Sequence, residues 1–435
     1  MLIQCTKPMN KLSIYLYLTI LFTVATSCEQ SVKSDNWEQE RLRRISLDFN
    51  KTEEQTFKQL QQYYPAITEQ EMEEWEKSNT LEHRIIDGEK RYFHSAARNL
   101  FITQGRQSNS LDIFLQSHIP TIVAAAKSGT PQKPINFKIK YTLTVDADAV
   151  PSGEVVKAWM PFVRKDPKNS NIKLISTSEP EYTIADEKYA HKSIYMEKVA
   201  EAGKPTIFEY IFSYDSRSEW FDFKAEDVKP YDTESELYKK FTAERENHVI
   251  FSDRIKTLTD SIVGSETNPY LKSKAIFHWI YNNFPWASAR EYSTIRNIPE
   301  YVLDIKHGDC GQVSLLFITM ARCAGIPAKW QSGWMLHPGE VNLHDWAEVY
   351  YEGIGWVPVD QSFGLTKSDD EDVVNFFTKG LDAYRLIVND DFSQEFYPAK
   401  THYRSETVDF QRGEVEWEGG NVYFNQWDYN LSFVD

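Results

Sequence analysis

Three residues whose side chains act together in acyl-transfer enzymes lie in one stretch of this chain. Cys310, His344 and Asp360 follow in the order of a nucleophile, a base and an orienting carboxylate. A thiolate attacks a carbonyl carbon, an imidazole moves the proton, and a carboxylate orients the imidazole and stabilises its charged form. The pattern therefore predicts a thiol acyl-transfer site in which these three residues are catalytic.

Cys310 is expected to begin a helix. Apolar residues recur at helical spacing after it, and Gly325 and Pro327 mark the end of the run. Free N–H groups and the helix dipole at this position favour the thiolate, and the Cys310 N–H is the expected oxyanion donor. Three nearby aromatic residues are weaker candidates for that donor, because such residues more often pack: Trp286, Tyr292 and Trp334.

A strand hairpin is expected to bring the histidine and the aspartate together. His344 begins an alternating segment typical of a strand, and the chain returns as a second strand that ends at Asp360. If residues 352–355 form the loop, Asp360 faces Ala347, on the opposite face from His344. The triad then needs a one-residue bulge, expected at Pro358 because proline cannot donate to the ladder.

Three motifs surround these residues: GDCGQ, ARCAGIPAKW and HDWAEVYYEGIGWVPVD. Together they resemble the core of the transglutaminase-like superfamily, over about residues 250–365. The resemblance implies a papain-like α+β core with Cys310 as nucleophile, His344 as base and Asp360 as its partner.

Two positions differ from the family pattern. Gly311 stands where animal transglutaminases carry a tryptophan after the cysteine, and Asp345 stands where alanine or cysteine is common. These differences weaken the inference that the chain cross-links proteins more than they weaken the inference of thiol chemistry.

The N-terminus has the layout of a targeting segment. Lys11 precedes an apolar run over residues 12–24, which is short for a membrane span, and Ala25-Thr26-Ser27-Cys28 follows. This is similar to a bacterial lipoprotein signal in which residues 1–27 are removed and Cys28 is lipidated; an ordinary signal peptide is the alternative. We therefore expect an extracytoplasmic protein of the bacterial cell envelope, attached to the membrane through its N-terminal lipid only.

Composition agrees with a large secreted enzyme. The 435 residues include 41% hydrophobic residues, enough for a sizeable core, and about two to four domains are expected. The formal net charge of −16 argues against nucleic acid as a partner. No phosphate loop or dinucleotide fingerprint occurs, so no cofactor is predicted.

Zinc binding is the weaker alternative for the candidate site. Its ligands would come from Cys310, His307, His337, His344 and Cys323, but no Cys-x-x-Cys or His-Glu-x-x-His spacing supports a metal. His337 is expected in a loop, and His307 is expected to flank the cleft.

The remaining cysteines support a reactive role for Cys310. Cys5 and Cys28 lie in the leader, which leaves Cys310 and Cys323 for the mature protein. A straight helix would separate these two by ~20 Å, too far for a disulfide. Cys323 is expected to pack, while an unpaired Cys310 in an oxidising compartment is expected to react.

Hydrophobic patterning divides the chain, and the predicted fold class is α+β. The N-terminal module has a capping box at Thr68-x-x-Glu71 and a hairpin turn at Asp87-Gly88. Strict alternation from Phe137 predicts strands. Five units are expected: a lipoprotein signal peptide (1–27), a mainly helical module (28–130), a β-sandwich domain (131–240), a transglutaminase-like catalytic core (241–375) and C-terminal strands that complete the core's surface or pack on the sandwich (376–435).

These observations predict a thiol-dependent enzyme that acts on peptide or glutamine-type amide bonds, with a polypeptide as its substrate. Hydrolysis is expected first, because bacterial relatives with this layout resemble peptidases and amidases. Protein-glutamine transamidation is the second alternative. A scaffold or binding lipoprotein that keeps the fold is the third, and the intact Cys-His-Asp set argues against it.

Overall fold

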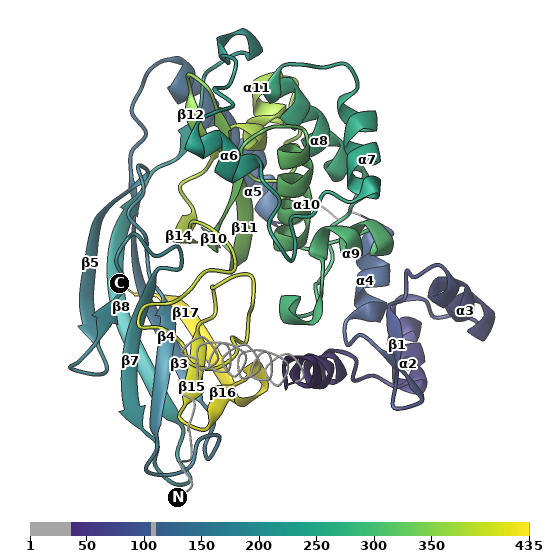
Figure 1. Cartoon of the computed structure of the whole chain (residues 1–435), viewed down its shortest axis with the longest axis vertical. Coiled ribbons are helices and arrows are strands. Elements are labelled where there is room, and N and C mark those ends of the chain that lie inside the picture. The colour runs from purple at the N-terminus through teal and green to yellow at the C-terminus, as the bar shows by residue number, and fades with distance from the viewer. Residues whose placement is uncertain (1–35, 106–109, 435) are drawn as a thin grey trace, which may run out of the picture.

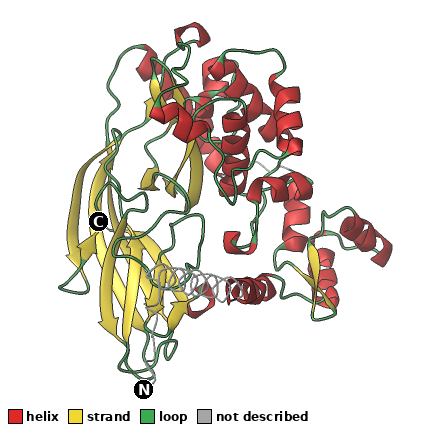
Figure 2. Cartoon of the chain, viewed as in Figure 1, coloured by secondary structure: helices red, strands yellow, loops and turns green. Residues whose placement is uncertain are grey.

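The computed structural model describes residues 36–105 and 110–434. Strands occupy one side of the molecule and most helices the other, with a four-stranded antiparallel sheet between them (Figures 1 and 2). The fold class is therefore the predicted α+β. The predicted signal peptide and the predicted lipidation site Cys28 lie outside the described residues.

The helices, besides helical residues 36–48, are α2 (Glu53–Tyr63), α3 (Glu69–Lys77), α4 (Ala96–Thr103), α5 (Ser110–Lys127), α6 (Glu236–Thr242), α7 (Asp253–Val263), α8 (Pro269–Asn283), α9 (Ile298–Ile305), α10 (Cys310–Cys323) and α11 (Glu371–Val374). Short 3₁₀ turns are η1 (Ala225–Asp227), η2 (Tyr292–Thr294), η3 (Phe376–Thr378) and η4 (Phe424–Gln426).

The strands are β1 (His83–Ile86), β2 (Glu89–Tyr92), β3 (Ile135–Val145), β4 (Val155–Pro161), β5 (Asn169–Thr177), β6 (Thr183–Ile184), β7 (Ser193–Val199), β8 (Thr206–Ser216), β9 (Glu219–Trp220), β10 (Ala328–His337), β11 (Glu340–Tyr351), β12 (Gly355–Val359), β13 (Gly380–Leu381), β14 (Arg385–Asn389), β15 (Glu414–Trp417), β16 (Gly420–Val422) and β17 (Trp427–Phe433).

The N-terminal module has a small core of its own, between residues 45 and 100. The predicted capping box is confirmed, because the Thr68 hydroxyl accepts from the Glu71 N–H and the Glu71 carboxylate accepts from the Thr68 N–H. The predicted hairpin is also confirmed: β1 and β2 pair around Asp87 and Gly88, whose φ angles are 51° and 81°. Positive φ at both positions suits the twist of a two-residue turn.

Helix α5 does not belong to that module. Its apolar face packs into the same core as α8 and α10. The predicted helix over residues 111–127 is correct, but its assignment to a helical unit reaching residue 130 is wrong. Periodicity shows that a helix has an apolar face, and it does not identify the surface which that face covers.

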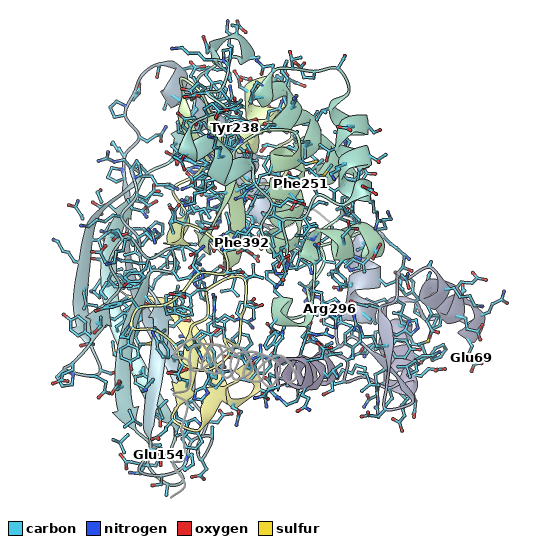
Figure 3. The ribbon with its side chains drawn as sticks, viewed as in Figure 1. Glu69, Glu154, Tyr238, Phe251, Arg296 and Phe392 are labelled. Atoms are coloured by element: carbon cyan, nitrogen blue, oxygen red, sulfur yellow. The ribbon has the colours of Figure 1, made fainter. Side chains whose placement is uncertain are left out.

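Two antiparallel sheets form the predicted sandwich. Their strand orders are β17-β3-β8-β5 and β16-β15-β4-β7-β6, and they enclose one hydrophobic core. The alternation seen in the sequence is confirmed in β3, where every second residue from Phe137 to Val145 is buried. Figure 3 places Glu154 at the far end of this sandwich and Phe392 between the sandwich and the helices.

The C-terminal strands mostly complete the sandwich. β15 pairs with β4, and β17 pairs with β3 from Trp427 to Phe433. Of the two alternatives expected for residues 376–435, β14 joins the central sheet beside β10, whereas β15 to β17 join the sandwich. Alternation of apolar and polar residues predicts a strand and its two faces. Which strand it pairs with depends on which sheet has an unpaired edge nearby, and the alternation does not specify this.

The central sheet has the order β12-β11-β10-β14. Strand β10 is buried on both faces: Trp330 packs into the helical core, and Trp334 packs into the sandwich core. Helices α7, α8 and α9 pack around α10, and the predicted N-caps Ser252 and Asn268 begin α7 and α8. The Cys310 helix therefore lies between a helical layer and this sheet.

Within residues 36–105 and 110–434, no helix has the length and apolar character that a membrane crossing requires.

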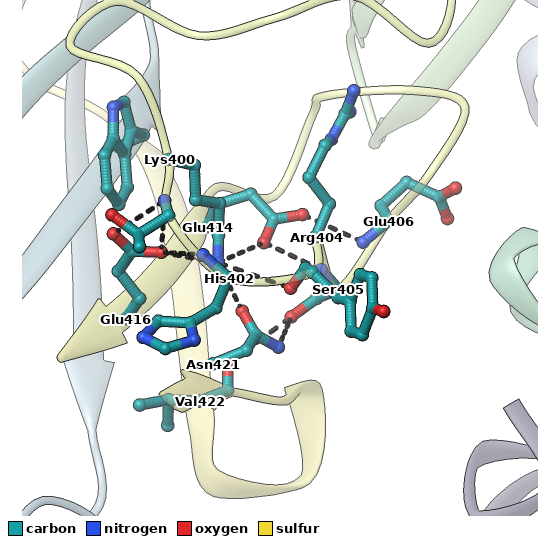
Figure 4. A network of polar contacts seen from close by, with 12 residues as sticks. Lys400, His402, Arg404, Ser405, Glu406, Glu414, Glu416, Asn421 and Val422 are labelled. Atoms are coloured by element: carbon teal, nitrogen blue, oxygen red, sulfur yellow. Dashed lines mark hydrogen bonds and ion pairs between the residues drawn. The ribbon is translucent and has the colours of Figure 1, made fainter. Parts of the chain in front are cut away.

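Residues 398–413, which we call the strap, connect the central sheet to β15 without regular secondary structure. Two strand carboxylates fix their path (Figure 4). Glu414 accepts from the Ser405 and Glu406 N–H groups, both at 2.8 Å. Glu416 accepts from the N–H groups of residues 401 and 402 and from the Lys400 ammonium at 3.2 Å.

Glu416→Gln is expected to destabilise the protein by about 3 kcal/mol, because it leaves the buried Lys400 ammonium without this charge partner. Urea unfolding at neutral pH would measure the loss. Glu418→Gln is the matched control, since Glu418 is exposed, and it should change the free energy of unfolding by less than about 0.5 kcal/mol. Equal effects of the two variants would contradict the role given to Glu416.

Candidate active site

Cys310 is the first residue of α10, as the sequence predicts. Asp309 caps the helix: its carboxylate accepts from the Gln312 N–H at 3.0 Å, and the Gln312 side chain accepts from the Asp309 N–H. The Cys310 N–H has no carbonyl four residues earlier within the helix to bond, so it stays suited to an oxyanion.

His344 and Asp360 are in direct contact. The His344 Nε2 lies 2.7 Å from Asp360 Oδ2, and both side chains are buried. An acceptor at Nε2 places the ring hydrogen there and leaves the Nδ1 lone pair free to take a proton. The expected orientation of the base is therefore present, while the catalytic role of the three residues stays a prediction.

The predicted bulge at Pro358 is wrong. Tyr351 pairs with Gly355, so the loop has three residues, and the register runs unbroken through Glu348 and Pro358 to the Ala347–Val359 pair. The next position, Asp360, thus falls on the face that carries His344. The sequence count assigned Gly355 to the loop, and this one-residue difference reverses the face.

A buried arginine supports Asp360. The Arg385 guanidinium on β14 donates to Asp360 Oδ2 at 3.0 Å, and both side chains are fully buried. Burial would raise the pKa of Asp360, but His344 and Arg385 outweigh it and hold the pKa below its usual value. Asp360 is therefore the charged partner that a protonated His344 requires.

His337 belongs to the same network and does not lie in a loop, which corrects the prediction. It ends β10, is fully buried, and its Nε2 lies 3.1 Å from both Asp382 Oδ2 and Arg385 Nη1. The network joins β10, β11 and β14 and the residue that follows β12. His307 is buried as well, and burial lowers its pKa to about 4.

The Cys310 thiol contacts Asp345. Sγ lies 3.1 Å from Asp345 Oδ2, and Cys310 remains partly exposed. Burial of the thiol, then the Asp345 and Asp309 carboxyl groups, raises its pKa well above the ordinary value. These effects favour the neutral thiol over the thiolate expected at the start of the helix.

His344 is neutral too. Burial lowers the pKa of its imidazole, and the Asp360 carboxylate opposes that shift only in part. The resting site thus holds a thiol and an imidazole, and an ion pair has to form during the reaction.

A cavity of about 960 Å³ contains both groups. Its walls come from α4, α5, the α10 start, β11 and the strap. Of the three aromatic candidates, Trp286 and Tyr292 line this cavity, and the Tyr292 hydroxyl already donates to Asp309. Trp334 instead packs in the sandwich core and donates to the Gln411 carbonyl.

Sequence reasoning missed three residues of this site. Arg385, Asp409 and Gln411 come from β14 and the strap, far along the chain from the motifs. Gln411 Nε2 donates to the His344 carbonyl at 2.9 Å and to Asp345 Oδ1 at 2.7 Å. No spacing pattern around these residues indicates a site, so tertiary structure was needed to find them.

The comparisons agree with the motifs. Residues 256–361 match the model of the transglutaminase-like superfamily. The chain is 30% identical over 159 residues to an uncharacterized protein of Haemophilus influenzae, which covers 30% of this chain and 41% of that protein. It is 27% identical over 134 residues to the uncharacterized protein YebA of Bacillus subtilis, covering 26% and 18% respectively. The chain thus spans less than half the length of these relatives.

Two solved structures are similar in part. A provisionally assigned cysteine protease of Cytophaga hutchinsonii has a TM-score of 0.46 and 15% identity, over 70% of this chain and 92% of that one. The periplasmic domain of TgpA from Pseudomonas aeruginosa has a TM-score of 0.28 and 14% identity, over 66% and 83%. Likeness at this level carries no conclusion about activity.

Arg385→Met is expected to destabilise the protein by about 3–5 kcal/mol, because it leaves Asp360 and Asp382 buried without their shared cation. The folded-state pKa of Asp360 is depressed, so this pair stabilises the fold above the unfolded-state pKa of about 3.9 and loses its effect as pH falls. Urea unfolding should show a larger deficit at pH 7 than at about pH 3, below the unfolded-state pKa.

The control is Arg296→Met, because the Arg296 side chain is 74% exposed (Figure 3). It should change stability by less than about 0.5 kcal/mol at either pH. A deficit in Arg385→Met that does not depend on pH would show that packing, and not charge, accounts for the loss.

Proposed function

We propose, from the premise that residues 256–361 belong to the transglutaminase-like superfamily, that this chain is a thiol-dependent hydrolase of peptide or glutamine-type amide bonds. One observation carries the proposal: Cys310 at the start of a helix shares a cavity with a histidine held by a buried carboxylate. Substrate polypeptide would lie in that cavity.

The chemistry follows from the groups present. The Cys310 proton passes to His344 Nδ1 as sulfur attacks the amide carbon, and the Cys310 N–H binds the oxyanion. His344 then protonates the leaving nitrogen, the C–N bond breaks, and a thioester remains. Water attacks the thioester with His344 as base, which releases the acid and restores the thiol. Asp360, which Arg385 keeps ionised, stabilises the protonated imidazole each time it forms.

Hydrolysis is favoured over transamidation by the lining of the cavity. Around Cys310 it includes the side chains of Asp309, Asp345, Asp409 and Gln411. Carboxyl and amide groups bind water, whereas a transamidase has to exclude water from its thioester. Transamidation of protein glutamine residues is the second candidate.

A scaffold protein that retains the fold is the third candidate. The buried Arg385–Asp360 pair argues against this candidate. A buried ion pair that serves only the fold can often be replaced by apolar residues without a loss of stability, so its presence here favours a role in the reaction. We further propose the extracytoplasmic, lipid-anchored location, which is supported by the leader sequence ending at Cys28.

Cys310→Ala is expected to reduce hydrolysis of a mixed peptide library, followed by mass spectrometry, by at least about 10³-fold because the nucleophile is lost. Its stability should change by no more than about 1–2 kcal/mol. The control is Cys323→Ala, which removes the other described thiol and should retain activity. Unchanged turnover in Cys310→Ala would end the enzyme proposal. Amine adducts on glutamine, in place of cut or deamidated peptides, would favour the transamidase.

Cys28→Ser is expected to move the full chain, expressed in a bacterial host, from the membrane fraction to the soluble fraction. The reason is that serine offers no thiol for the lipid. Radiolabelled palmitate should label the native chain and Cys323→Ser but not Cys28→Ser. Equal labelling of all three chains would contradict the lipid anchor.

A further inference from the structure

Two buried carboxyl groups lie beside the candidate nucleophile. Asp345 follows His344 on β11 and is 2% exposed, and Asp409 lies on the strap and is 3% exposed. Their side chains are within hydrogen-bonding reach of each other, and Asp345 Oδ2 also contacts the Cys310 Sγ. The pair therefore adjoins the thiol.

The hydrogen bonds of Asp409 show where a proton is needed. Its Oδ1 accepts from the Ser332 hydroxyl at 2.5 Å, the Asn389 amide at 2.9 Å and the Phe410 N–H at 2.7 Å. Its Oδ2 is buried and receives no hydrogen bond from any group in the described part of the chain. A buried carboxylate oxygen requires a donor, and a protonated Asp345 supplies one.

The surrounding charges agree with one proton on the pair. Burial, then the charge of Asp409, raises the pKa of Asp345 well above its usual value. Burial also raises the pKa of Asp409, against the hydrogen bonds that it accepts and the Arg404 cation. The other groups facing the pair are the Asp309 carboxyl, the Tyr292 hydroxyl and the Gln411 amide, none of which is a cation. Against the single Arg404 cation, full ionisation of both aspartates would leave one negative charge uncompensated.

Gly311 provides the room for this contact. A Cβ at position 311 would lie 2.7 Å from Asp345 Oδ2 and 2.2 Å from the Tyr292 hydroxyl. A side chain after the nucleophile and a carboxyl group at position 345 therefore compete for one space. The two residues that differ from the family pattern, Gly311 and Asp345, are therefore neighbours in this structure.

We propose that Asp345 and Asp409 share one proton and one negative charge, and that Asp345 is a positioning residue which holds the Cys310 thiol hydrogen before substrate binds. Asp345 carries the shared proton, and Asp409 is the carboxylate. The thiol turns from Asp345 toward His344 when substrate enters, so ion-pair formation is coupled to binding. This role rests on the proposed thiol chemistry.

The test is the pH dependence of Cys310 alkylation by iodoacetamide in the full chain, with the adduct located by mass spectrometry. Asp345→Asn should leave the rate at pH 8 within about twofold, because the Asn amide donates to Asp409 as the shared proton did. Asp409→Asn should slow it about tenfold, since the charge then moves to Asp345 beside the thiol. The double variant should label about tenfold faster than the native chain, because the charge is gone.

Asp304→Asn, a change of an exposed carboxylate, is the control and should have no effect. Equal rates in Asp409→Asn and the double variant, or a native labelling midpoint below the ordinary thiol pKa of about 8.5, would overturn the proposal. If the single variants fail to fold, the pH midpoint of Cys310 labelling in the native chain still tests the proposal. Labelling needs no substrate. The labelling experiment can therefore contradict the role of the Asp345–Asp409 pair even if Cys310→Ala abolishes hydrolysis, so the two proposals are tested separately.

Discussion

The buried charge on Asp360 is the interaction on which the rest of the site depends. A fully buried carboxylate without partners is not stable. Asp360 has two partners, because His344 on β11 and Arg385 on β14 both bind its carboxylate. The three residues tie the two outer strands of the central sheet to its interior. The same contacts fix the tautomer of the base, so the stability of the sheet and the orientation of His344 have a common origin.

The protonation of the thiol results from two opposing effects. The start of α10 favours the thiolate, but a helix terminus contributes only about 0.3–1 kcal/mol, which is less than one pKa unit. Burial and neighbouring carboxyl groups shift a pKa by several units. The second effect is larger here, so Cys310 rests as a thiol and its activation has to come from His344 and from the substrate.

The strap connects the candidate site to the sandwich. Glu414 and Glu416 hold its backbone against the sandwich (Figure 4), and its other end places Asp409 and Gln411 against β11. The sandwich is therefore more than a neighbouring domain, because its strands anchor residues that line the cavity. A change in the sandwich that releases the strap is expected to reach Asp345 and the thiol.

The sequence by itself determined what depends on short-range order: the α+β class, the helix that begins at Cys310, the caps at Ser252 and Asn268, and the alternating strands. These follow from local hydrogen bonds and from periodicity. The tertiary structure decided the face of Asp360, the partners Arg385 and Asp409, the sheet joined by each C-terminal strand and the protonation of Cys310. Register, strand partners and pKa values depend on which distant segments pack together in the interior. The spacing of residues along the chain does not specify those contacts.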